Sequence, residues 1–417
     1  MRAQRRPAGQ PHLAPWRAGS ARRGTRGRPP PLPALTPRRG PWCNRCVMAA
    51  RTIELDPDRF DREELVPAAE ALRAGQLVIF PTETVYGVGA RADDPEAVRR
   101  LRAFKQRGAD KPFARLAPDA VAALEPLAHV PPRVLPAARE LWPGPFTLVL
   151  PQPGGASEGV RVPQHRLAQT LLRLAEVPVA ASSANRAGEP PPTTAEQARR
   201  AVDEQVAVFV AGGPARLAQP STVLEVADTR WRILRQGLLD AAILRPRLET
   251  LVLFVCTGNS CRSPMAEGLF RARLSELLGI APADLARHGL LVQSAGVAAG
   301  HGASPSPQAV RVLAERGIDI AGHRSQPVTE ALVQRAQLIV AMGPGHVHSL
   351  LSWWPEIAPR LMLIRDEGVA DPIGSSEAVY RESAAQIEAG FDRVLDRLFG
   401  DALGRLVLRK RRRGEKP

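Results

Sequence analysis

The amino-acid sequence predicts an α/β protein composed of two domains. With 417 residues, the chain is longer than one hydrophobic core usually accommodates, so two domains are expected. In the C-terminal half, short apolar runs typical of buried strands alternate with longer stretches typical of helices, and this alternation favours a parallel sheet. Polar segments rich in Gly, Ser and Thr follow several apolar runs, and ligands of such sheets bind where the strands end.

The net charge of +15 is concentrated in two tails. Residues 1–47 contain eleven arginines and no acidic residue, and residues 409–417 carry a net charge of +5, so the remainder is close to neutral. Four cysteines do not make a disulfide framework. No apolar run is long enough to span a bilayer, and the first residues lack the apolar core of a signal peptide. These features favour a cytoplasmic protein that does not associate with membranes.

Residues 1–47 are rich in Arg, Pro and Gly and lack periodicity, so we expect a disordered arm. The favoured interpretation is a translated upstream stretch, with Met48 as the true start. A basic arm that contacts nucleic acid, double-stranded RNA included, and a mitochondrial presequence are the alternatives. Cys43 and Cys46 lie in this arm, but a zinc site would need two further ligands nearby, and the sequence offers none.

The stretch 251–267 predicts a reactive anion site. Five apolar residues, 251–255, indicate a buried parallel strand, and Pro264 marks the start of a helix. The loop between them points backbone N–H groups inward and adds the positive end of the helix dipole, so it should bind an anion. Cys256 opens the loop, where the same groups stabilise a thiolate and make it a nucleophile at neutral pH. Arg262 closes the loop and can hold an anion with its planar fork.

This loop resembles that of the low-molecular-weight protein-tyrosine phosphatase family, and the resemblance covers residues 250–400. It implies a Rossmann-like parallel-sheet domain that needs no cofactor, and a phosphocysteine intermediate on Cys256. Arg262 and the loop amides would hold the phosphoryl oxygens, and Asp371, in the segment 371–374, would be the general acid. The resemblance further implies that Asn259 shapes the loop and that Ser263 hydrogen-bonds the thiolate. The other supporting loop residues would be Thr257, Gly258, Ser260 and Cys261.

Thr257 bears on the phosphorylated protein substrate. The sequence around it resembles the bacterial protein-arginine phosphatases, in which a Thr at this position is associated with phosphoarginine, whereas a bulky apolar residue suits a phosphotyrosine ring. We therefore favour phosphoarginine and keep phosphotyrosine as the alternative. An arsenate reductase would need redox cysteines beyond the loop, and none follows Cys261. A protective disulfide between Cys256 and Cys261 under oxidation is a further hypothesis.

The segment 50–240 contains strand-like runs that end in hydroxyl, amide or basic groups. The run 77–80 leads into a Thr- and Gly-rich segment, and the run 178–185 closes with two serines and an asparagine. Lys105 and Arg107 follow a helical stretch, where a solvated charged face is the commoner explanation and a polyphosphate site is the alternative. Arg161 stands in an apolar run and therefore needs a partner.

Seven motifs occur in this segment in a fixed order: PTETVYG, KxR followed by KP, PGPFT, RVP, SSAN, PSTV and ILRxG. Together they resemble the YrdC/TsaC family of L-threonylcarbamoyladenylate synthases. The resemblance implies a YrdC-like twisted mixed α/β sheet with a basic cavity that binds L-threonine, bicarbonate and ATP. The product, threonylcarbamoyl-AMP, feeds the modification of adenosine 37 of tRNA, so the tRNA modification machinery is the implied partner.

The motifs also imply the site residues. The ATP site would comprise Lys105, Arg107, Thr147, Ser183, Asn185 and Arg235, and the threonine site Thr82, Arg161 and Ser221. Mg²⁺ is expected to accompany ATP, although no acidic cluster marks its place. A His that some relatives carry after the KP motif is absent from the segment 113–116. The alternative for this domain is a non-catalytic RNA- or nucleotide-binding module.

The predicted organisation follows from these resemblances. A YrdC-like domain at 50–240 and a phosphatase-like domain at 250–400 flank a linker at 241–249. Residues 1–47 form the arm and 401–417 a basic tail, which we expect to be solvated, with contact to tRNA or another polyanion as the alternative. The chain is thus expected to be a bifunctional enzyme.

Overall fold

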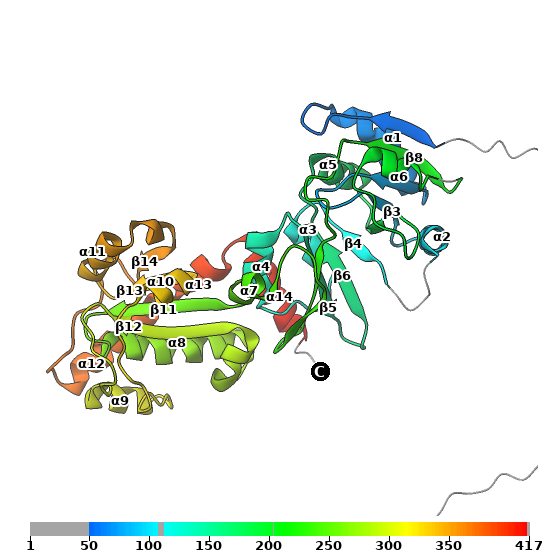
Figure 1. Cartoon of the computed structure of the whole chain (residues 1–417). Coiled ribbons are helices and arrows are strands. Elements are labelled where there is room, and N and C mark those ends of the chain that lie inside the picture. The colour runs from blue at the N-terminus through cyan, green and yellow to red at the C-terminus, as the bar shows by residue number, and fades with distance from the viewer. Residues whose placement is uncertain (1–49, 107–111, 203, 415–417) are drawn as a thin grey trace, which may run out of the picture. The chain divides into compact units, whose positions relative to one another are not determined.

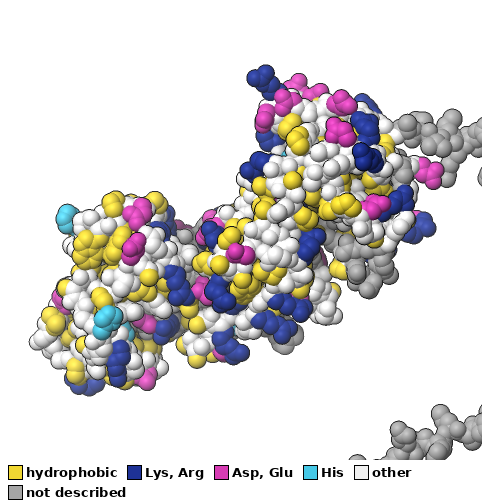
Figure 2. Space-filling view, in the orientation of Figure 1, with side chains coloured by type: hydrophobic (Ala, Val, Ile, Leu, Met, Phe, Trp, Pro, Cys, Tyr) yellow, Lys and Arg dark blue, Asp and Glu magenta, His cyan; other side chains and the backbone are white. Residues whose placement is uncertain are grey.

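The structure is a computed structural model that describes residues 50–106, 112–202 and 204–414. The expected arm and Arg107 lie outside these residues. The described chain contains two sheets, one before and one after residue 240 (Figure 1). Figure 2 shows basic and acidic side chains interspersed over the visible face, as expected for a nearly neutral globular part.

The first sheet is mixed and has ten strands. Their order is β1-β8-β2-β3-β7-β4-β6-β5-β9-β10, and the last two form an antiparallel pair. The strands are β1 (Arg51–Glu54), β2 (Leu77–Phe80), β3 (Gly87–Arg91), β4 (Ala114–Leu116), β5 (Phe146–Pro151), β6 (Ser157–Arg161), β7 (Val179–Ser183), β8 (Val206–Ala211), β9 (Thr222–Val226) and β10 (Trp231–Arg235). This arrangement agrees with the mixed α/β sheet that the motifs imply.

Helices cover both faces of the central strands of this sheet. All four residues of β2 are buried: Val78 and Phe80 pack with α1 and α5 on one face, and Leu77 and Ile79 pack with α2 on the other. The sequence of β2 is a continuous apolar run because both faces of this strand are buried. The helices are η1 (Arg62–Leu65), α1 (Val66–Arg73), α2 (Pro95–Lys105), α3 (Ala120–Leu124), α4 (Val134–Leu141), α5 (Arg166–Ala175) and α6 (Ala195–Arg199).

The second sheet is entirely parallel, as the alternating pattern predicts. Its order is β12-β11-β13-β14. The strands are β11 (Thr250–Cys256), β12 (Leu290–Gly296), β13 (Leu338–Ala341) and β14 (Leu361–Leu363). The chain runs from β11 to β12 on one side and then returns to β13 on the other. The loop after β11 therefore lies at the point where strand order reverses, and such points bind ligands in parallel sheets.

Helices cover both faces of β11. Phe254 packs edge-on against Phe270 of α8 at a centroid distance of 5.4 Å, and Phe270 packs against Phe391 at 5.1 Å. In Figure 1, α8 runs along β11 and β12, while α10 and α11 lie on the other side. The helices are α8 (Arg262–Leu278), η3 (Pro282–His288), α9 (Pro307–Ala314), α10 (Glu330–Arg335), α11 (Pro344–Trp353), η4 (Pro355–Arg360), α12 (Glu377–Ala389), α13 (Phe391–Phe399) and α14 (Ala402–Gly414).

Three segments differ from the simplest reading of the sequence. The expected linker holds α7 (Ala241–Leu244) and η2 (Arg245–Leu248), whose last leucines are buried. The apolar-patterned stretch 378–398, which could form one helix, instead forms two that meet at Gly390, where a Cβ would lie 2.4 Å from a carbonyl oxygen. The basic tail begins as α14, with Leu406 and Val407 buried, so it is not simply solvated. Among the described residues, no helix is long and apolar enough to cross a membrane.

Candidate active sites

The loop between β11 and α8 is shaped by Asn259. This residue has a left-handed backbone with φ of 54°, which Asn tolerates better than most residues, and it is fully buried. Its amide nitrogen donates to the hydroxyls of Ser263 and Ser294, both at 2.9 Å, and its amide oxygen accepts from the backbone N–H of Gln326 at 2.9 Å. Three separate parts of the chain thus fix the loop through one side chain.

Cys256 lies at the end of β11 with its sulfur in a hydrogen-bonding environment. The Ser263 hydroxyl is 2.9 Å from Sγ, and the backbone N–H of Asn259 donates to Sγ at 3.3 Å. Ser263 belongs to the first turn of α8, so the dipole of a seventeen-residue helix begins beside the sulfur. The backbone N–H and the start of the helix thus both direct positive potential toward the sulfur.

Arg262 and Asp371 are brought together beside this loop. Nη2 of Arg262 donates to Asp371 at 2.5 Å and to the Thr257 hydroxyl at 3.3 Å, while Nη1 donates to the carbonyl of Val369 at 3.1 Å. The side chain of Arg262 is 8% exposed and that of Asp371 is 41% exposed. The arginine is therefore fixed, and the acid stands at the solvent side of the site.

The structure adds residues to the site that the sequence did not single out. Ser294, at the end of β12, joins Asn259 to the carboxylate of Glu267, and Nε2 of His323 lies 3.0 Å from the carbonyl of Asn259. Nε2 of His346, from α11, lies 2.9 Å from the Thr257 hydroxyl. Ser294 lies near the carboxyl end of β12, and His346 follows the carboxyl end of β13 (Leu338–Ala341). Their position at this edge of a parallel sheet is the feature by which the sequence could have indicated them.

The second thiol of the loop, Cys261, is also buried. Its sulfur lies 3.3 Å from the hydroxyl of Tyr380 in α12. Burial, and next the contact with Cys261, raise the pKa of Tyr380 to about 12, so the phenol stays protonated. Both thiols are free in this structure.

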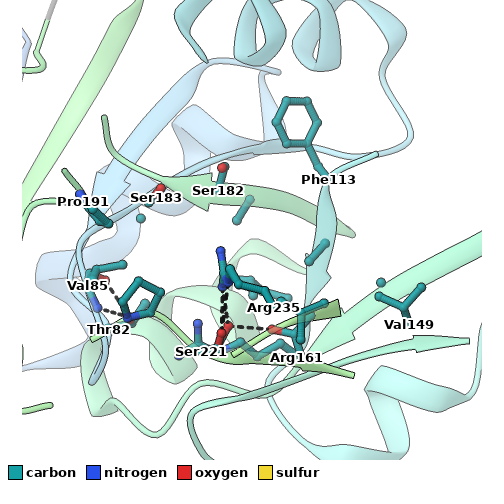
Figure 3. A pocket seen from close by; sticks show the side chains of 18 of the residues that line it. Thr82, Val85, Phe113, Val149, Arg161, Ser182, Ser183, Pro191, Ser221 and Arg235 are labelled. Atoms are coloured by element: carbon teal, nitrogen blue, oxygen red, sulfur yellow. Dashed lines mark hydrogen bonds between the residues drawn. The ribbon is translucent and has the colours of Figure 1, made fainter. Parts of the chain in front are cut away.

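A second site lies in the first sheet, where six of the residues implied by the motifs line one cavity (Figure 3). They come from β5, β6, β7, β10 and the loops that follow β2 and precede β9. These residues are Thr82, Thr147, Arg161, Ser183, Ser221 and Arg235. The two other described residues that the motifs imply are Lys105 and Asn185. Lys105 donates to Asn185 and, at 2.7 Å, to the carbonyl of Ser183, so Lys105 and Asn185 lie directly beside the cavity wall.

Hydroxyl and guanidinium groups are linked across this cavity. Arg235 donates to the carbonyl of Ser221 at 2.8 Å and to its hydroxyl at 3.1 Å, and that hydroxyl lies 2.9 Å from the hydroxyl of Thr147. Figure 3 shows Arg235 and Ser221 facing each other in the cavity. The fixed cation and the row of hydroxyls suit a ligand that combines negative charge with hydrogen-bonding groups.

Arg161 forms an ion pair with Glu83, a residue that the sequence analysis did not assign to the site. Nη2 of Arg161 donates to Glu83 at 2.7 Å and to the Thr84 hydroxyl at 2.8 Å, and the Glu83 side chain is 1% exposed. Nε of Arg161 is buried and has no hydrogen-bond partner among the described residues. Within the same residues, no group of three His, Cys, Asp or Glu is placed to hold a metal.

Comparison with known proteins gives two family models that match separate parts of the chain. Residues 70–237 match the family model for Sua5, YciO and YrdC proteins, described as "Telomere recombination". Residues 251–403 match the model described as "Low molecular weight phosphotyrosine protein phosphatase".

Individual relatives match one part each. The threonylcarbamoyl-AMP synthase of Bacillus subtilis is 36% identical over 200 residues, which are 45% of this chain and 56% of the relative, so the chain spans little more than half of that relative's length. A putative threonylcarbamoyl-AMP synthase of Mycobacterium tuberculosis is 40% identical over 193 residues, which are 44% of this chain and 87% of the relative. The crystal structure of a low molecular weight protein tyrosine phosphatase from T. tengcongensis is 39% identical with a TM-score of 0.32, covering 36% of this chain and 99% of that one. The chain therefore belongs to the Sua5/YrdC family of threonylcarbamoyl-AMP synthases through residues 70–237 and to the low molecular weight phosphotyrosine protein phosphatase family through residues 251–403.

Proposed function

We propose that the domain at 50–240 condenses L-threonine, bicarbonate and ATP into threonylcarbamoyl-AMP, with release of pyrophosphate. The observation that carries this proposal is the convergence of six polar side chains, implied separately by their motifs, on one cavity. The carbamate of threonine is an anion that must approach the α-phosphorus of an anionic nucleotide. Fixed cations and hydroxyls are what such a reaction needs to offset the repulsion.

The roles follow from the contacts. Lys105 contacts the carbonyl of Ser183 and Arg235 contacts that of Ser221, and both cations would screen the phosphates. Ser183 and Thr147 would offer hydroxyls to the nucleotide. Arg161 would bind the threonine carboxylate through its buried Nε, which lacks a partner among the described residues. Mg²⁺ would arrive with ATP as part of the substrate, and the product would serve tRNA modification in the cytoplasm.

Pyrophosphate release by the full chain tests this proposal. We expect release that requires threonine, bicarbonate and ATP together. A non-catalytic nucleotide-binding module would instead bind ATP without turnover, and that result would remove the proposal.

The domain at 250–400 acts as a cysteine-dependent phosphatase. The thiolate of Cys256 attacks the phosphorus while the loop amides and Arg262 hold its oxygens, and Asp371 protonates the leaving atom. The same carboxylate then takes a proton from water, which attacks the phosphocysteine and releases phosphate. The contacts of the Cys256 sulfur with the Ser263 hydroxyl and the backbone N–H of Asn259 support this role for the sulfur.

Hydrolysis of p-nitrophenyl phosphate tests the phosphatase mechanism. Cys256→Ser should abolish it, because an alcohol beside a helix N-terminus is a far weaker nucleophile than a thiolate. Unchanged hydrolysis in this variant would refute the mechanism.

Phosphoarginine is the proposed substrate of this domain, with phosphotyrosine as the alternative. Thr257 supports it, because a small, exposed residue with a hydroxyl group follows the nucleophile and leaves both room and polarity for a guanidinium. Phosphoarginine, phosphotyrosine and phosphoserine peptides of one sequence, offered to the full chain, should be hydrolysed in that order of kcat/KM. A higher kcat/KM for phosphotyrosine would overturn the preference without affecting the mechanism.

A further inference from the structure

A buried ion pair lies at the wall of the cavity in the first sheet. Glu83 belongs to the segment that follows β2, and Arg161 is the last residue of β6. Nη2 of Arg161 donates to Glu83 at 2.7 Å, and the two side chains are 10% and 1% exposed, respectively. Arg161 lines the cavity, whereas Glu83 is not among the described residues that line it (Figure 3). The Glu83 carboxylate can therefore affect a ligand only through the position and the net charge of the pair.

Both oxygens of the Glu83 carboxylate are used within the protein. Oε1 accepts from Arg161, and Oε2 accepts from the backbone N–H of Gln164 at 3.0 Å. A buried ion pair of this kind contributes little net stability, because the cost of removing two charges from water offsets much of their attraction. Stability is thus a weak reason for a carboxylate at this place, and the adjoining cavity provides a functional one.

The guanidinium of Arg161 is fixed at one corner. Nη2 carries two protons, and it donates to Glu83 and, at 2.8 Å, to the hydroxyl of Thr84, both in buried contacts. The Thr84 hydroxyl lies 2.9 Å from that of Thr82, which lines the cavity. Nε and Nη1 make no hydrogen bond with the described residues. The arginine is therefore held from one side, and its remaining N–H groups are left for a ligand.

The ion pair also carries no net charge. Glu83 cancels the charge of Arg161 at hydrogen-bond distance, and charges interact strongly where water is excluded. An amino acid brings one carboxylate, which can bind the remaining N–H groups of the guanidinium through hydrogen bonds. A phosphate group carries more negative charge, and Glu83 would repel it without a net positive charge to offset the repulsion. This part of the cavity therefore favours a carboxylate over a phosphate.

We propose that Glu83 is a positioning residue that determines which anion binds at Arg161. It holds the guanidinium in place for the carboxylate of the amino acid, and its charge keeps phosphate groups away. This inference rests on the proposed synthase function and deepens it. The cavity has to receive an amino acid and a nucleotide together, and the phosphates are assigned to Lys105 and Arg235. If Arg161 retained phosphate groups, they would occupy the place of the amino acid and exclude threonine.

Competition by inorganic phosphate tests this role. Glu83→Gln keeps the size of the side chain and removes its charge, so Arg161 becomes a net cation. The assay follows formation of threonylcarbamoyl-AMP by chromatography at saturating ATP. A phosphate concentration that leaves the wild-type KM for threonine unchanged should raise that KM roughly tenfold in Glu83→Gln, as expected for a new hydrogen bond between charged groups. An active Glu83→Gln variant in which phosphate does not compete with threonine would overturn the proposal.

Thr84→Val is the matched control, because it removes the uncharged contact of the same nitrogen and leaves the ion pair intact. This variant should have a higher KM for threonine, since Arg161 loses one of the two contacts that fix it. Phosphate should not compete with threonine in this variant. Equal competition in Thr84→Val and Glu83→Gln would mean that the charge of Glu83 is not the cause, contrary to the proposal.

The unaltered protein gives a result even if the variants fail to fold. Equilibrium dialysis of radioactive threonine against the full chain should yield the same Kd with and without inorganic phosphate. A Kd that rises in proportion to the phosphate concentration would contradict the inference. The two proposals stay separable: a wild type that binds threonine without forming threonylcarbamoyl-AMP removes the synthase function, whereas the effect of phosphate on threonine binding is judged in either case.

Discussion

Two arginines of strand β10 differ in what they face. Arg235 lines the cavity beside Ser221, whereas Arg232 pairs with Glu225 and is 68% exposed. We expect Arg235→Ala to lower kcat/KM for ATP in pyrophosphate release by about tenfold or more, since a hydrogen bond to a charged group contributes roughly 1.5–3 kcal/mol. Arg232→Ala should have little effect. Similar losses in the two variants would contradict the placement of the phosphates at Arg235.

The acid function of Asp371 can be separated from its contact with Arg262. Asp371→Asn keeps the size of the side chain but cannot release a proton. For a phosphopeptide, kcat/KM, which reports the step in which the leaving group departs, should fall by roughly 10²–10⁴, the usual contribution of a general acid. The fall in kcat/KM should be smaller for p-nitrophenyl phosphate, whose leaving group needs little protonation. Asp366→Asn, at an exposed carboxylate paired with Arg393, is the control. The same loss for both substrates would mean that Asp371 is not the acid.

At the scale of elements, the end of β12 supports the phosphate loop through a glycine. A Cβ at Gly296 would lie 2.4 Å from the carbonyl oxygen of Thr257 and 2.9 Å from the backbone nitrogen of Asn259. Gly296→Ala should therefore displace the loop and lower hydrolysis of p-nitrophenyl phosphate at least roughly tenfold, because small misplacements of a reacting group are costly.

Gly300 provides the comparison for this prediction. A Cβ at Gly300 would meet nothing within 4 Å, so Gly300→Ala should retain activity. If Gly296→Ala were as active as Gly300→Ala, the close approach of β12 to the loop would not matter for catalysis.

Helix α14 contributes to stability although its sequence resembles a solvated basic tail. Leu406 is 1% exposed, whereas Arg409 on the same helix is exposed. Leu406→Ala should lower the free energy of unfolding by about 2–5 kcal/mol, the range for removing a buried leucine, and Arg409→Ala should change it little. Urea denaturation of both variants measures the difference. Equal stabilities would indicate that α14 does not belong to the core.

At the scale of the whole molecule, histidines that are buried or half-buried make the fold sensitive to acid. Burial lowers the pKa of His165, His288 and His346 below the usual value of about 6.5. Just below that value the unfolded chain binds more protons than the folded one, so the free energy of unfolding falls as the pH drops from about 7 toward 5, and it is unaffected by these groups above pH 7.

Denaturation at several pH values measures this dependence. His165→Gln should reduce the loss of stability between pH 7 and pH 5, because Gln cannot take up a proton. A variant with the same loss as the wild type would show that His165 does not contribute. In the wild type, Nδ1 of His165 is buried and has no hydrogen-bond partner among the described residues, so protonation of this atom is unfavourable.

The sequence predicts local features of both domains well and long-range contacts poorly. The strand 77–80 has the bounds that its apolar run suggests. The Cys256 loop is recognisable because nucleophile and arginine lie six residues apart. By contrast, Glu83 is 78 residues from Arg161, and the contact between Thr257 and His346 spans 89 residues. No local pattern encodes such pairs, nor the order of ten strands, because they depend on how distant segments meet.

The pairing of Arg262 with Asp371 has a consequence for how the phosphatase receives its substrate. The guanidinium already has an anionic neighbour. In the mechanism proposed above, an incoming phosphoryl group would therefore take the place of a carboxylate rather than meet an isolated cation. Arrival of substrate would release Asp371 for proton transfer, and departure of phosphate would restore the original pair. The net long-range attraction in such an exchange would be small, so we expect kcat/KM to depend only weakly on ionic strength.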